Sequence, residues 1–505
     1  MIIDLNEVLS DPFAEKEIDV CICGAGVAGI TLALNLSRKL NVLLLEGGGF
    51  EFSADSQSVY QGESVGQQYT PLSATRLRYL GGASNHWGGW CRPLDSYDFE
   101  PKDTVQDSGW PIRRADLDPY LEKTESILDL SDNDDWHQPG DTIGKKIDAT
   151  RAFQTFNFKW SNPPTRFGQK YRKEIERRSN VFCYLNANVT ELHLTENLSR
   201  LQRINVRNYS GKIFQVPAQI FILAAGGIEN PRILLNSNHQ VPAGLGNRNG
   251  LVGQYFADHL HATAGEFILE DPMREYLEEN WFEGSFKARL EGLICGSRWA
   301  GEWVRKIPRK KKSCVSQAHR MFFSPSLEFI ERDRILNFGL RFLPYEPGTE
   351  RATDGVLTIE SEQALNPLSR ITLAPEVDQF GMRRVKLDWQ LSAIDLHTIQ
   401  RAVFRFGQTF ADLDLGRVRV ADWLRSDPPK FTGEGGNHHM CTTRMAETPD
   451  KGVVDQHQRV FGTDNLYVAG SGVFSSTGHA NPTFTIVQMT LRLADHISMQ
   501  AKKNT

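Results

Sequence analysis

The chain has 505 residues, of which 40% are hydrophobic and 24% charged, which is the composition of an ordinary globular protein long enough for two domains. The formal net charge of −5 excludes a general attraction to nucleic acid, and no apolar stretch approaches the roughly 20 residues that span a bilayer. The N-terminus lacks the basic start and apolar run of a secretory signal, and the seven scattered cysteines indicate reduced thiols, so we expect a cytoplasmic protein.

The first elements along the chain predict a dinucleotide-binding unit. Ile18–Cys23 has the pattern of a short buried strand, Ile30–Leu40 that of a helix, and Asn41–Leu45 that of a second buried strand. The glycine-rich sequence GAGVAG, residues 24–29, joins the first strand to the helix. This order of strand, turn, helix and strand is the context in which such a turn binds a dinucleotide.

Each glycine of the turn has its own predicted role. Gly24 permits the tight turn, Gly26 lets the backbone approach a pyrophosphate at the helix N-terminus, and Gly29 lets helix and strand pack closely. Glu46 follows about twenty residues later, where an acidic residue accepts the ribose hydroxyls. An acidic residue at this place disfavours NADP, because it would repel a 2′-phosphate.

The middle of the chain predicts further sheet structure. Residues 131–150 are polar and indicate an exposed loop, and several strand-like runs fill residues 180–224. The last of these runs enters a second glycine turn, Ala225-Gly226-Gly227, which is followed by a helical segment at Pro231–Leu235.

Residues 263–350 carry many aromatic side chains and one basic run, Arg305–Lys312, which we interpret as a solvated loop, with docking to an acidic partner or a membrane surface as the alternative. Period-two stretches at Arg370–Leu373 and Arg384–Trp389, followed by an amphipathic helix around Asp395–Leu413, predict a sheet with helices behind it.

The C-terminal part contains two motifs suited to redox chemistry on an alcohol, HHMCTTRM at 438–445 and NPTFTIV at 481–487. His438, His439 and Cys441 have no second cluster with ligand spacing, so we expect no metal site. With the N-terminal turn, these motifs distribute one site over both ends of the chain, which favours one interwoven enzyme over a string of modules.

The whole chain resembles the glucose–methanol–choline (GMC) family of flavin oxidoreductases. The resemblance rests on the GAGVAG turn, LGGASNHWGG at 80–89, AAGGIENPRILLNS at 224–237 and VGQYFADHLH at 252–261, followed by both C-terminal motifs in the expected order. It is closest to the branch of pyranose 2-oxidase and the bacterial fructose, gluconate and glucose dehydrogenases.

This resemblance implies an α/β fold, α+β overall, with a Rossmann-like FAD-binding domain and a discontinuous substrate domain built on an antiparallel sheet. The implied FAD-binding domain comprises residues 1–95, 180–262 and 435–505, and the substrate-binding domain comprises residues 96–179 and 263–434. The implied reaction oxidises a hydroxyl group of a small-molecule sugar, glycoside or cyclitol to a carbonyl, by hydride transfer to N5 of FAD with a histidine base.

The resemblance also implies the catalytic residues. The family places its base three residues before a Gly or Cys that precedes Thr, which is His438 here, and its partner about forty residues later, which is Asn481. His439 is the neighbouring candidate for the base, and a swap between Asn481 and His479 is left open. An asparagine orients the substrate oxygen without competing for its proton.

The implied FAD contacts extend beyond the first turn. A covalent bond from His86 to the flavin methyl and a non-covalent histidine beside the ring are both left open. Asp258-His259 resembles an Asp-His pair at the domain junction, interpreted as structural, and Gly470 replaces an aspartate of many relatives. The remaining expected FAD contacts are Gly81, Gly82, Ser84, Asn85, Ala187, Val189, Ala225, Ser471, Pro482 and Thr483.

Two alternative functions stay open at this point. One is oxidation of a non-sugar secondary-metabolite alcohol, and the other is the flavoprotein subunit of an electron-transfer dehydrogenase complex. O₂ and another electron acceptor are equally compatible with the motifs, as are several oligomeric states.

Overall fold

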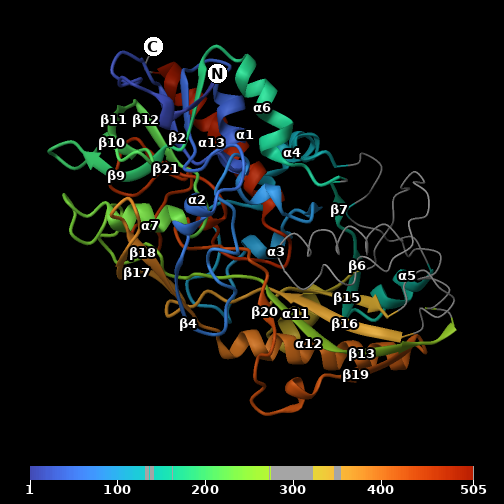
Figure 1. Ribbon diagram of the computed structural model, residues 1–505. Coiled ribbons are helices and arrows are strands. Elements are labelled where there is room, and N and C mark those ends of the chain that lie inside the picture. Colours follow the sequence, from blue (N-terminus) through green and yellow to red (C-terminus); the bar gives the residue numbers. More distant parts are fainter. Residues whose placement is uncertain are drawn as a thin grey trace.

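The computed structural model of the chain describes residues 1–130, 136, 142–161, 163–271, 273, 322–345 and 354–503. Its central feature is a six-stranded parallel sheet (Figure 1). The strands run in the order β1 (Ile2–Asp4), β8 (Val181–Leu185), β3 (Val42–Leu45), β2 (Val20–Cys23), β12 (Ile220–Leu223) and β21 (Leu466–Val468). Segments from the start, middle and end of the chain therefore meet in one sheet.

Both faces of this sheet are covered, which explains why its strands are apolar throughout. Val20 and Ile22 point to a layer of helices that includes α1 (Val27–Leu36) and α13 (Thr483–Lys503). Cys21 and Cys23 point to the opposite face, which packs on a three-stranded antiparallel sheet. That sheet consists of β9 (Asn188–Leu194), β10 (Leu201–Arg207) and β11 (Ile213–Pro217).

Helix α1 ends at Leu36, four residues before the predicted end at Leu40. The Asn180 side-chain amide donates hydrogen bonds to the carbonyls of Ser37 (2.6 Å) and Leu40 (2.8 Å). These bonds hold the segment that follows α1 as the chain turns into β3. The sequence pattern did not reveal where the helix ends because the residue that holds this segment is far away in the chain.

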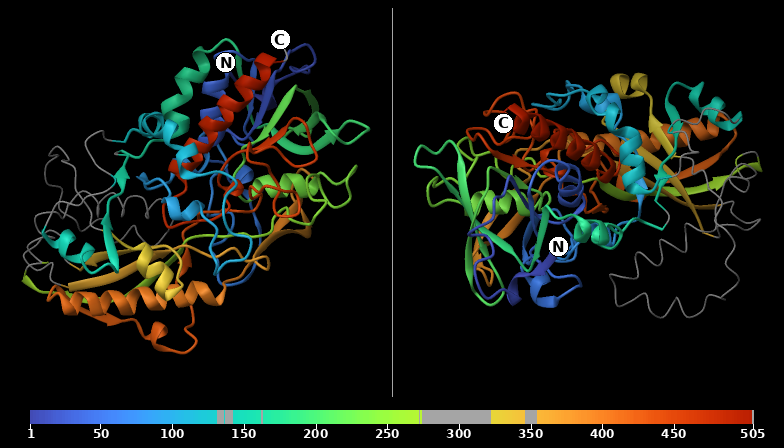
Figure 2. Two further views of the ribbon diagram at one scale, coloured as in Figure 1. Left: turned by 180° about the vertical axis from the view of Figure 1, so that it is seen from behind. Right: turned by 90° about the horizontal axis from the view of Figure 1, so that it is seen from above.

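A second, mostly antiparallel sheet forms the other half of the molecule (Figure 2). Its strands are β19 (Gly416–Val420), β13 (Leu260–Leu269), β16 (Asp354–Ser361), β15 (Phe338–Pro344), β14 (Phe322–Pro325) and β6 (Phe153–Phe156), and β20 (Glu434–Gly435) also pairs with β13. Helix α12 (Ala393–Asp412) packs across one face and shares an aromatic core with the sheet. Helix α11 (Leu327–Asp333) lies in the same half.

Smaller elements connect the two halves. β17 (Arg370–Val377) and β18 (Arg383–Trp389) form a sheet with β4 (Gly62–Gly66), and helix α7 (Glu229–Asn236) packs on β17. β5 (Trp90–Cys91) pairs with β7 (Lys159–Trp160). The remaining helices are α2 (Ala54–Ser58), α3 (Ser96–Phe99), α4 (Leu121–Leu128), α5 (Thr142–Asp148) and α6 (Phe167–Arg177).

The predicted domain boundaries stay a prediction, since several segments serve both halves. β6 of the segment 96–179 joins the antiparallel sheet, whereas α4 and α6 of the same segment contact α13 and α1. The expectation of a loop over residues 131–150 is wrong in part, because α5 forms there and packs Ile143 and Ile147 into the core of the second half. The basic run Arg305–Lys312 lies outside the described residues.

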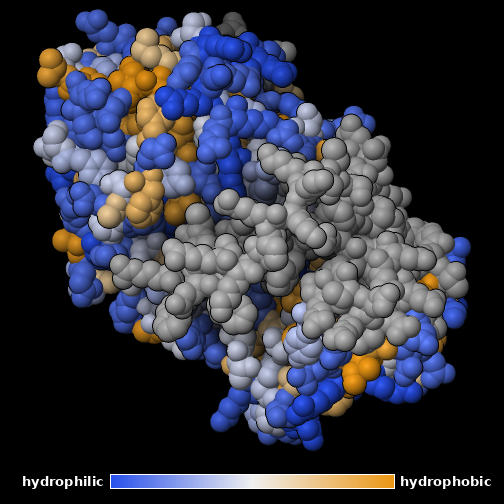
Figure 3. All heavy atoms as spheres, turned by 45° about the vertical axis from the view of Figure 1, so that its right-hand side comes forward, coloured by the Kyte–Doolittle hydropathy of each residue, from blue (hydrophilic) through white to orange (hydrophobic). Residues whose placement is uncertain are grey.

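The face of the molecule in Figure 3 is mainly polar where its residues are described. Figure 3 shows hydrophilic side chains over most of it, with small groups of hydrophobic ones between them. None of the described helices is long and apolar enough to cross a membrane. The N-terminus and the end of α13 lie at the same end of the molecule (Figure 2).

Candidate active site

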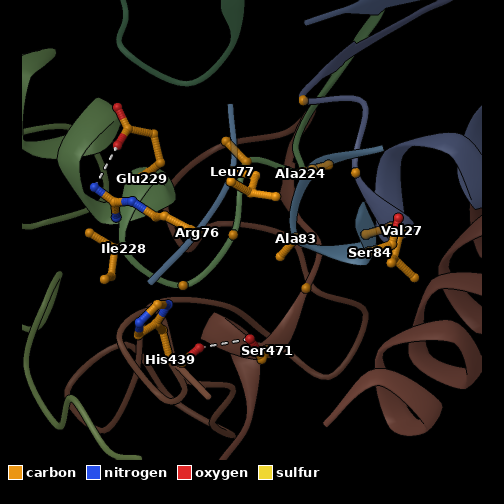
Figure 4. A pocket seen from close by; sticks show the side chains of 18 of the residues that line it. Val27, Arg76, Leu77, Ala83, Ser84, Ala224, Ile228, Glu229, His439 and Ser471 are labelled. Carbon is orange, nitrogen blue, oxygen red and sulfur yellow. Dashed lines mark hydrogen bonds and ion pairs between the residues drawn. The ribbon is translucent and has the colours of Figure 1, made fainter. Parts of the chain in front are cut away.

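A cavity of about 490 Å³ lies where the carboxyl ends of β2 and β12 meet the C-terminal segment. Clefts at this edge of an open parallel sheet are the usual place for a bound dinucleotide. Figure 4 shows side chains from four separate segments around it. Most of the predicted site residues line it, namely Gly24, Gly26, Glu46, Gly82, Ser84, His86, Ala187, Val189, Ala225, His438, His439, Gly470, Ser471, Asn481, Pro482 and Thr483.

The first glycine turn has the geometry that its sequence indicates. Gly24 has φ of +113°, and a Cβ there would lie 2.7 Å from the carbonyl oxygen of Ala224, the residue after β12. A Cβ at Gly29 would lie 1.8 Å from the carbonyl oxygen of Gly24, so only glycine lets α1 approach the turn. Gly26 differs from both, because a Cβ there would meet no atom within 4 Å. Gly26 therefore borders open space at the start of α1.

Glu46 stands at the end of β3 with its carboxylate held in place. Its oxygens accept hydrogen bonds from the backbone N–H groups of Ala25 (2.9 Å) and Gly48 (3.0 Å). The carboxylate thereby ties the glycine turn to the end of β3. Each carboxylate oxygen has a second acceptor site, which leaves capacity for the hydroxyl groups of a ribose.

Gly29, Gly81 and Asn85 do not line the cavity but support it. Gly81 adopts φ of +96° and its N–H donates to the carbonyl of Ala25 at 2.8 Å. The Asn85 side-chain amide donates to the carbonyl of Leu80 at 2.9 Å. These bonds hold the LGGAS segment against the first glycine turn, so that Gly82 and Ser84 face the cavity.

His86 lines the cavity close to His439. Burial, together with the nearby Arg166 guanidinium, lowers the pKa of His86, so its imidazole is neutral near pH 7. The choice between a covalent and a non-covalent histidine stays a prediction.

Asp258, which precedes β13, holds the segment that carries the predicted base. Its carboxylate accepts hydrogen bonds from the backbone N–H groups of His438 (2.8 Å) and Asn437 (3.0 Å) and from the Tyr69 hydroxyl. Ser471 holds the next residue, because its hydroxyl donates to the carbonyl of His439 at 2.7 Å (Figure 4). Both histidines are therefore fixed through their backbone.

The two adjacent histidines have different surroundings. Burial and the neighbouring imidazoles of His259 and His261 lower the pKa of His438 well below its usual value. Burial, together with the Arg76 guanidinium, lowers the pKa of His439 to about 3. Figure 4 shows the His439 ring on the same side of the pocket as Arg76, opposite Ser84. Both rings are thus neutral near pH 7 and able to accept a proton.

Asn481 lines the cavity just before α13, whereas His479 does not. The Asn481 Oδ1 atom is buried and has no hydrogen-bond partner in the described structure. His479 packs instead on the Phe156 ring, with 4.9 Å between ring centroids, and its Nδ1 lies 4.0 Å from the Asp95 carboxylate. The arrangement therefore favours Asn481 over His479 as the partner of the base.

Sequence reasoning missed a group of charged residues on the cavity wall. Arg76 forms an ion pair with Glu229 at 3.6 Å (Figure 4), and Glu229 also pairs with Arg232 at 2.6 Å. The Arg78 guanidinium donates to the Asn188 side chain at 2.5 Å. The sequence did contain a signal for this group, since Arg76 and Arg78 alternate just before the LGG sequence. Alternation alone, however, is typical of any half-exposed strand.

The residues present fit an FAD molecule. A Cβ added at Gly26, Gly226 or Gly470 would meet no atom within 4 Å, so the backbone at three turns borders unfilled space. Buried polar atoms without partners face the same cavity, among them Nε2 of His439 and Oδ1 of Asn481. Since buried polar groups are normally satisfied, these atoms indicate a bound polar molecule.

Comparisons with known proteins agree with this site. Residues 366–490 match the GMC oxidoreductase family model that covers the C-terminal part of such enzymes. The 2-methyl-1,2-propanediol dehydrogenase of Mycolicibacterium austroafricanum is 24% identical over 95% of this chain and 95% of its own. The pyranose 2-oxidase of Tricholoma matsutake is 22% identical over 88% of this chain and 77% of its own.

Among solved structures, pyridoxine 4-oxidase from Mesorbium loti matches with a TM-score of 0.60 and 17% identity, covering 96% of this chain and 99% of that one. At this identity the match shows the fold alone. Together the comparisons confirm the predicted family resemblance, the fold class and FAD as the cofactor.

Proposed function

We propose that this chain, a flavin-dependent oxidoreductase of the glucose–methanol–choline family, oxidises a hydroxyl group of a sugar, glycoside or cyclitol to a carbonyl. FAD, when bound, supplies the acceptor for the hydride that leaves the substrate carbon. The observation that carries the proposal is that His438 and Asn481 line the same cavity as the dinucleotide-binding turn. A proton acceptor and an oxygen-binding amide thus adjoin the place of the cofactor.

Several elements would hold the cofactor. The Gly24–Gly26 turn at the start of α1 would hold its pyrophosphate, and Glu46 its ribose hydroxyls. Ala187 and Val189 would contact the adenine side. Thr483 begins α13, a helix of 21 residues, and the positive end of its dipole would favour negative charge on the flavin.

His438 would remove the proton of the substrate hydroxyl. Its pKa is lowered by burial and by the neighbouring histidines, so the imidazole is unprotonated at neutral pH and able to act as a general base. The hydroxyl proton passes to the imidazole while the carbon loses a hydride, and the product is a carbonyl. Charge therefore develops on the imidazole.

Asn481 would orient the substrate oxygen. An amide side chain can donate a hydrogen bond to the oxygen while its own oxygen accepts one from another group. It takes no proton at any pH at which proteins are folded, so it leaves proton removal to His438. The buried Asn481 Oδ1 without a partner is consistent with a position reserved for a bound molecule.

The names of two relatives bear on the substrate class. Pyranose 2-oxidase is named for a sugar, and the dehydrogenase relative for a propanediol. The substrate is therefore either a sugar-like polyol or a smaller alcohol, and O₂ is the first electron acceptor that we propose to test. An electron-transfer complex is the alternative for the acceptor.

One anaerobic screen tests the proposal. The purified FAD-loaded protein is mixed with a panel of sugars, glycosides and cyclitols, and bleaching of the flavin absorbance is recorded, with 1,2-propanediol as a non-sugar comparison. We expect bleaching by at least one member of the sugar panel and return of the colour on admission of air. Bleaching by the diol alone would replace the sugar proposal by the non-sugar alternative.

A further inference from the structure

The ring of His438 is part of a group of three histidines. His259 lies just before the start of β13, and its Nδ1 is 2.9 Å from Nδ1 of His438, with 5.0 Å between the ring centroids. His261 completes the group with its ring centroid 5.9 Å from that of His438. The three ligand atoms that these rings offer lie within 4.8 Å of one another.

The distance between the first two rings identifies a hydrogen bond. Two nitrogens bound at about 2.0–2.1 Å to one tetrahedral zinc ion would lie about 3.3 Å apart. The observed 2.9 Å is shorter and matches a direct N–H···N hydrogen bond. One of the two Nδ1 atoms must therefore carry a hydrogen, and the other must accept it.

The second ring nitrogen of His259, Nε2, decides which of the two rings donates the hydrogen bond. Nε2 of His259 lies 3.2 Å from the carbonyl oxygen of Thr477, and a carbonyl oxygen can only accept. Nε2 of His259 therefore carries the hydrogen. A neutral imidazole has one N–H group, so Nδ1 of His259 is an acceptor and Nδ1 of His438 is the donor.

We propose that His259 is a positioning residue that holds His438 in the tautomer with its hydrogen on Nδ1, so that Nε2 presents the lone pair that accepts the proton of the substrate. The inference deepens the proposed function, since it rests on His438 as the base. His438 lines the cavity, and within the described part of the chain its Nε2 forms no hydrogen bond. The opposite tautomer would present an N–H group and accept nothing.

The environment holds this pair in a neutral state. Burial lowers the pKa of His259, so its ring stays a single donor and a single acceptor. The other titratable groups around the pair are His261, His439, His479, Asp258, Glu360 and Glu362. Glu362 pairs with the Lys102 ammonium group, Glu360 pairs with Arg341 at 3.3 Å, and the Asp258 carboxylate is occupied by backbone N–H groups and Tyr69.

The tautomer can be observed directly. The FAD-loaded protein labelled with ¹⁵N-histidine is examined by long-range ¹H–¹⁵N correlation at pH 8, and the His438→Asn and His259→Asn variants assign the signals. We expect His438 protonated on Nδ1 and His259 on Nε2. A His438 ring protonated on Nε2 overturns the proposal. This measurement does not depend on which alcohol is oxidised, so it decides the tautomer even where every compound in the substrate screen fails.

Kinetics of flavin reduction give a second test with matched variants. His259→Leu removes the acceptor, and we expect reduction to slow by about 10²-fold, less than the roughly 10⁴-fold loss for the charged partner of a catalytic histidine. His259→Asn keeps an acceptor oxygen near the position of Nδ1 and is expected to retain an intermediate rate. His397→Asn, at an exposed position on α12, is the control and should stay near the wild-type rate.

The substrate concentration at half-maximal rate should change little in the His259 variants, since His259 is not one of the residues that line the cavity. Equal rates in His259→Leu and wild type would contradict the proposal. Where His259→Leu fails to fold, the Asn variant and the tautomer of the wild-type enzyme still decide.

Discussion

At the residue scale, His438 combines a lowered pKa with a place in the cavity wall. Replacing it by alanine should leave FAD bound but slow flavin reduction by at least about 10²-fold, because a general base is lost. Wild-type reduction should slow only at a pH below the usual histidine range, where the imidazole takes up a proton, and His438→Ala should lack this dependence. Stopped-flow absorbance under anaerobic conditions measures both.

Asn481→Ala is the companion variant and should lose less, because Asn481 orients an oxygen but moves no proton. Near-normal reduction in His438→Ala together with collapse in His439→Ala or His479→Ala would move the base to another histidine. The family and the cofactor would be unaffected by that outcome.

His86 supports a second prediction at this scale. Its neutral imidazole lines the cavity, where it is available as a nucleophile toward the flavin methyl group or as a non-covalent neighbour. Acid precipitation of the purified protein separates the two cases. Flavin that stays in the pellet of the wild type but is released from His86→Ala indicates the covalent bond, and flavin released from both indicates non-covalent binding.

At the element scale, two glycines of one turn should respond differently to substitution. Gly26→Glu should fold but fail to bind FAD, because its side chain enters open space where the pyrophosphate is expected. Gly29→Ala should lower the stability of the protein itself by about 1–3 kcal/mol or more, because its Cβ would collide with the carbonyl of Gly24 between β2 and α1.

Flavin content and thermal unfolding of both variants test this pair. Full flavin content in Gly26→Glu would show that the pyrophosphate lies elsewhere. An unchanged unfolding temperature in Gly29→Ala would show that the turn and α1 separate without loss.

A buried ion pair provides another prediction at the element scale. Arg232 on α7 pairs with Asp378, which lies between β17 and β18, at 2.6 Å. Asp378→Ala leaves the buried guanidinium without this partner and should cost about 3–5 kcal/mol of stability. Urea unfolding measures the loss, and Arg425→Ala, which removes an exposed pair with Asp422, is a matched control expected to change stability by less than about 1 kcal/mol.

At the scale of the whole molecule, buried histidines should make the protein sensitive to acid. Burial lowers the pKa of His479 and of His439 to about 3. Between pH 6.5 and 3 the unfolded chain binds protons at these positions and the folded chain does not, so stability falls as the pH falls. Asp98 and Asp395, whose pKa values burial raises to about 7, act in the opposite direction over the same range.

A comparison with His479→Gln isolates one contribution. Between pH 7 and 4 the wild type should lose more thermal stability than this variant, because the variant has no imidazole to protonate on unfolding. Calorimetry at four or five pH values gives the two slopes. Parallel slopes would show that His479 is already protonated in the folded protein.

The sequence by itself determined the local parts of this protein. The strand, turn and helix around Gly24–Gly29 were readable because each depends on neighbouring residues, through backbone sterics and the burial pattern of a sheet covered on both faces. The family motifs likewise indicated His438 and Asn481, and most of the site residues predicted from the sequence line the cavity.

Only the tertiary structure decided what depends on contacts between distant segments. Asn180 donates a hydrogen bond to the carbonyl of Leu40, 140 residues earlier, in the segment that follows α1. Arg76 and Glu229, which are also far apart in the chain, form an ion pair on the cavity wall. His259 appeared in the sequence as half of a structural pair, yet the fold places its ring against that of His438, 179 residues away. Hydrogen bonds and ion pairs act over a few ångströms in space, and sequence spacing contains no measure of that distance.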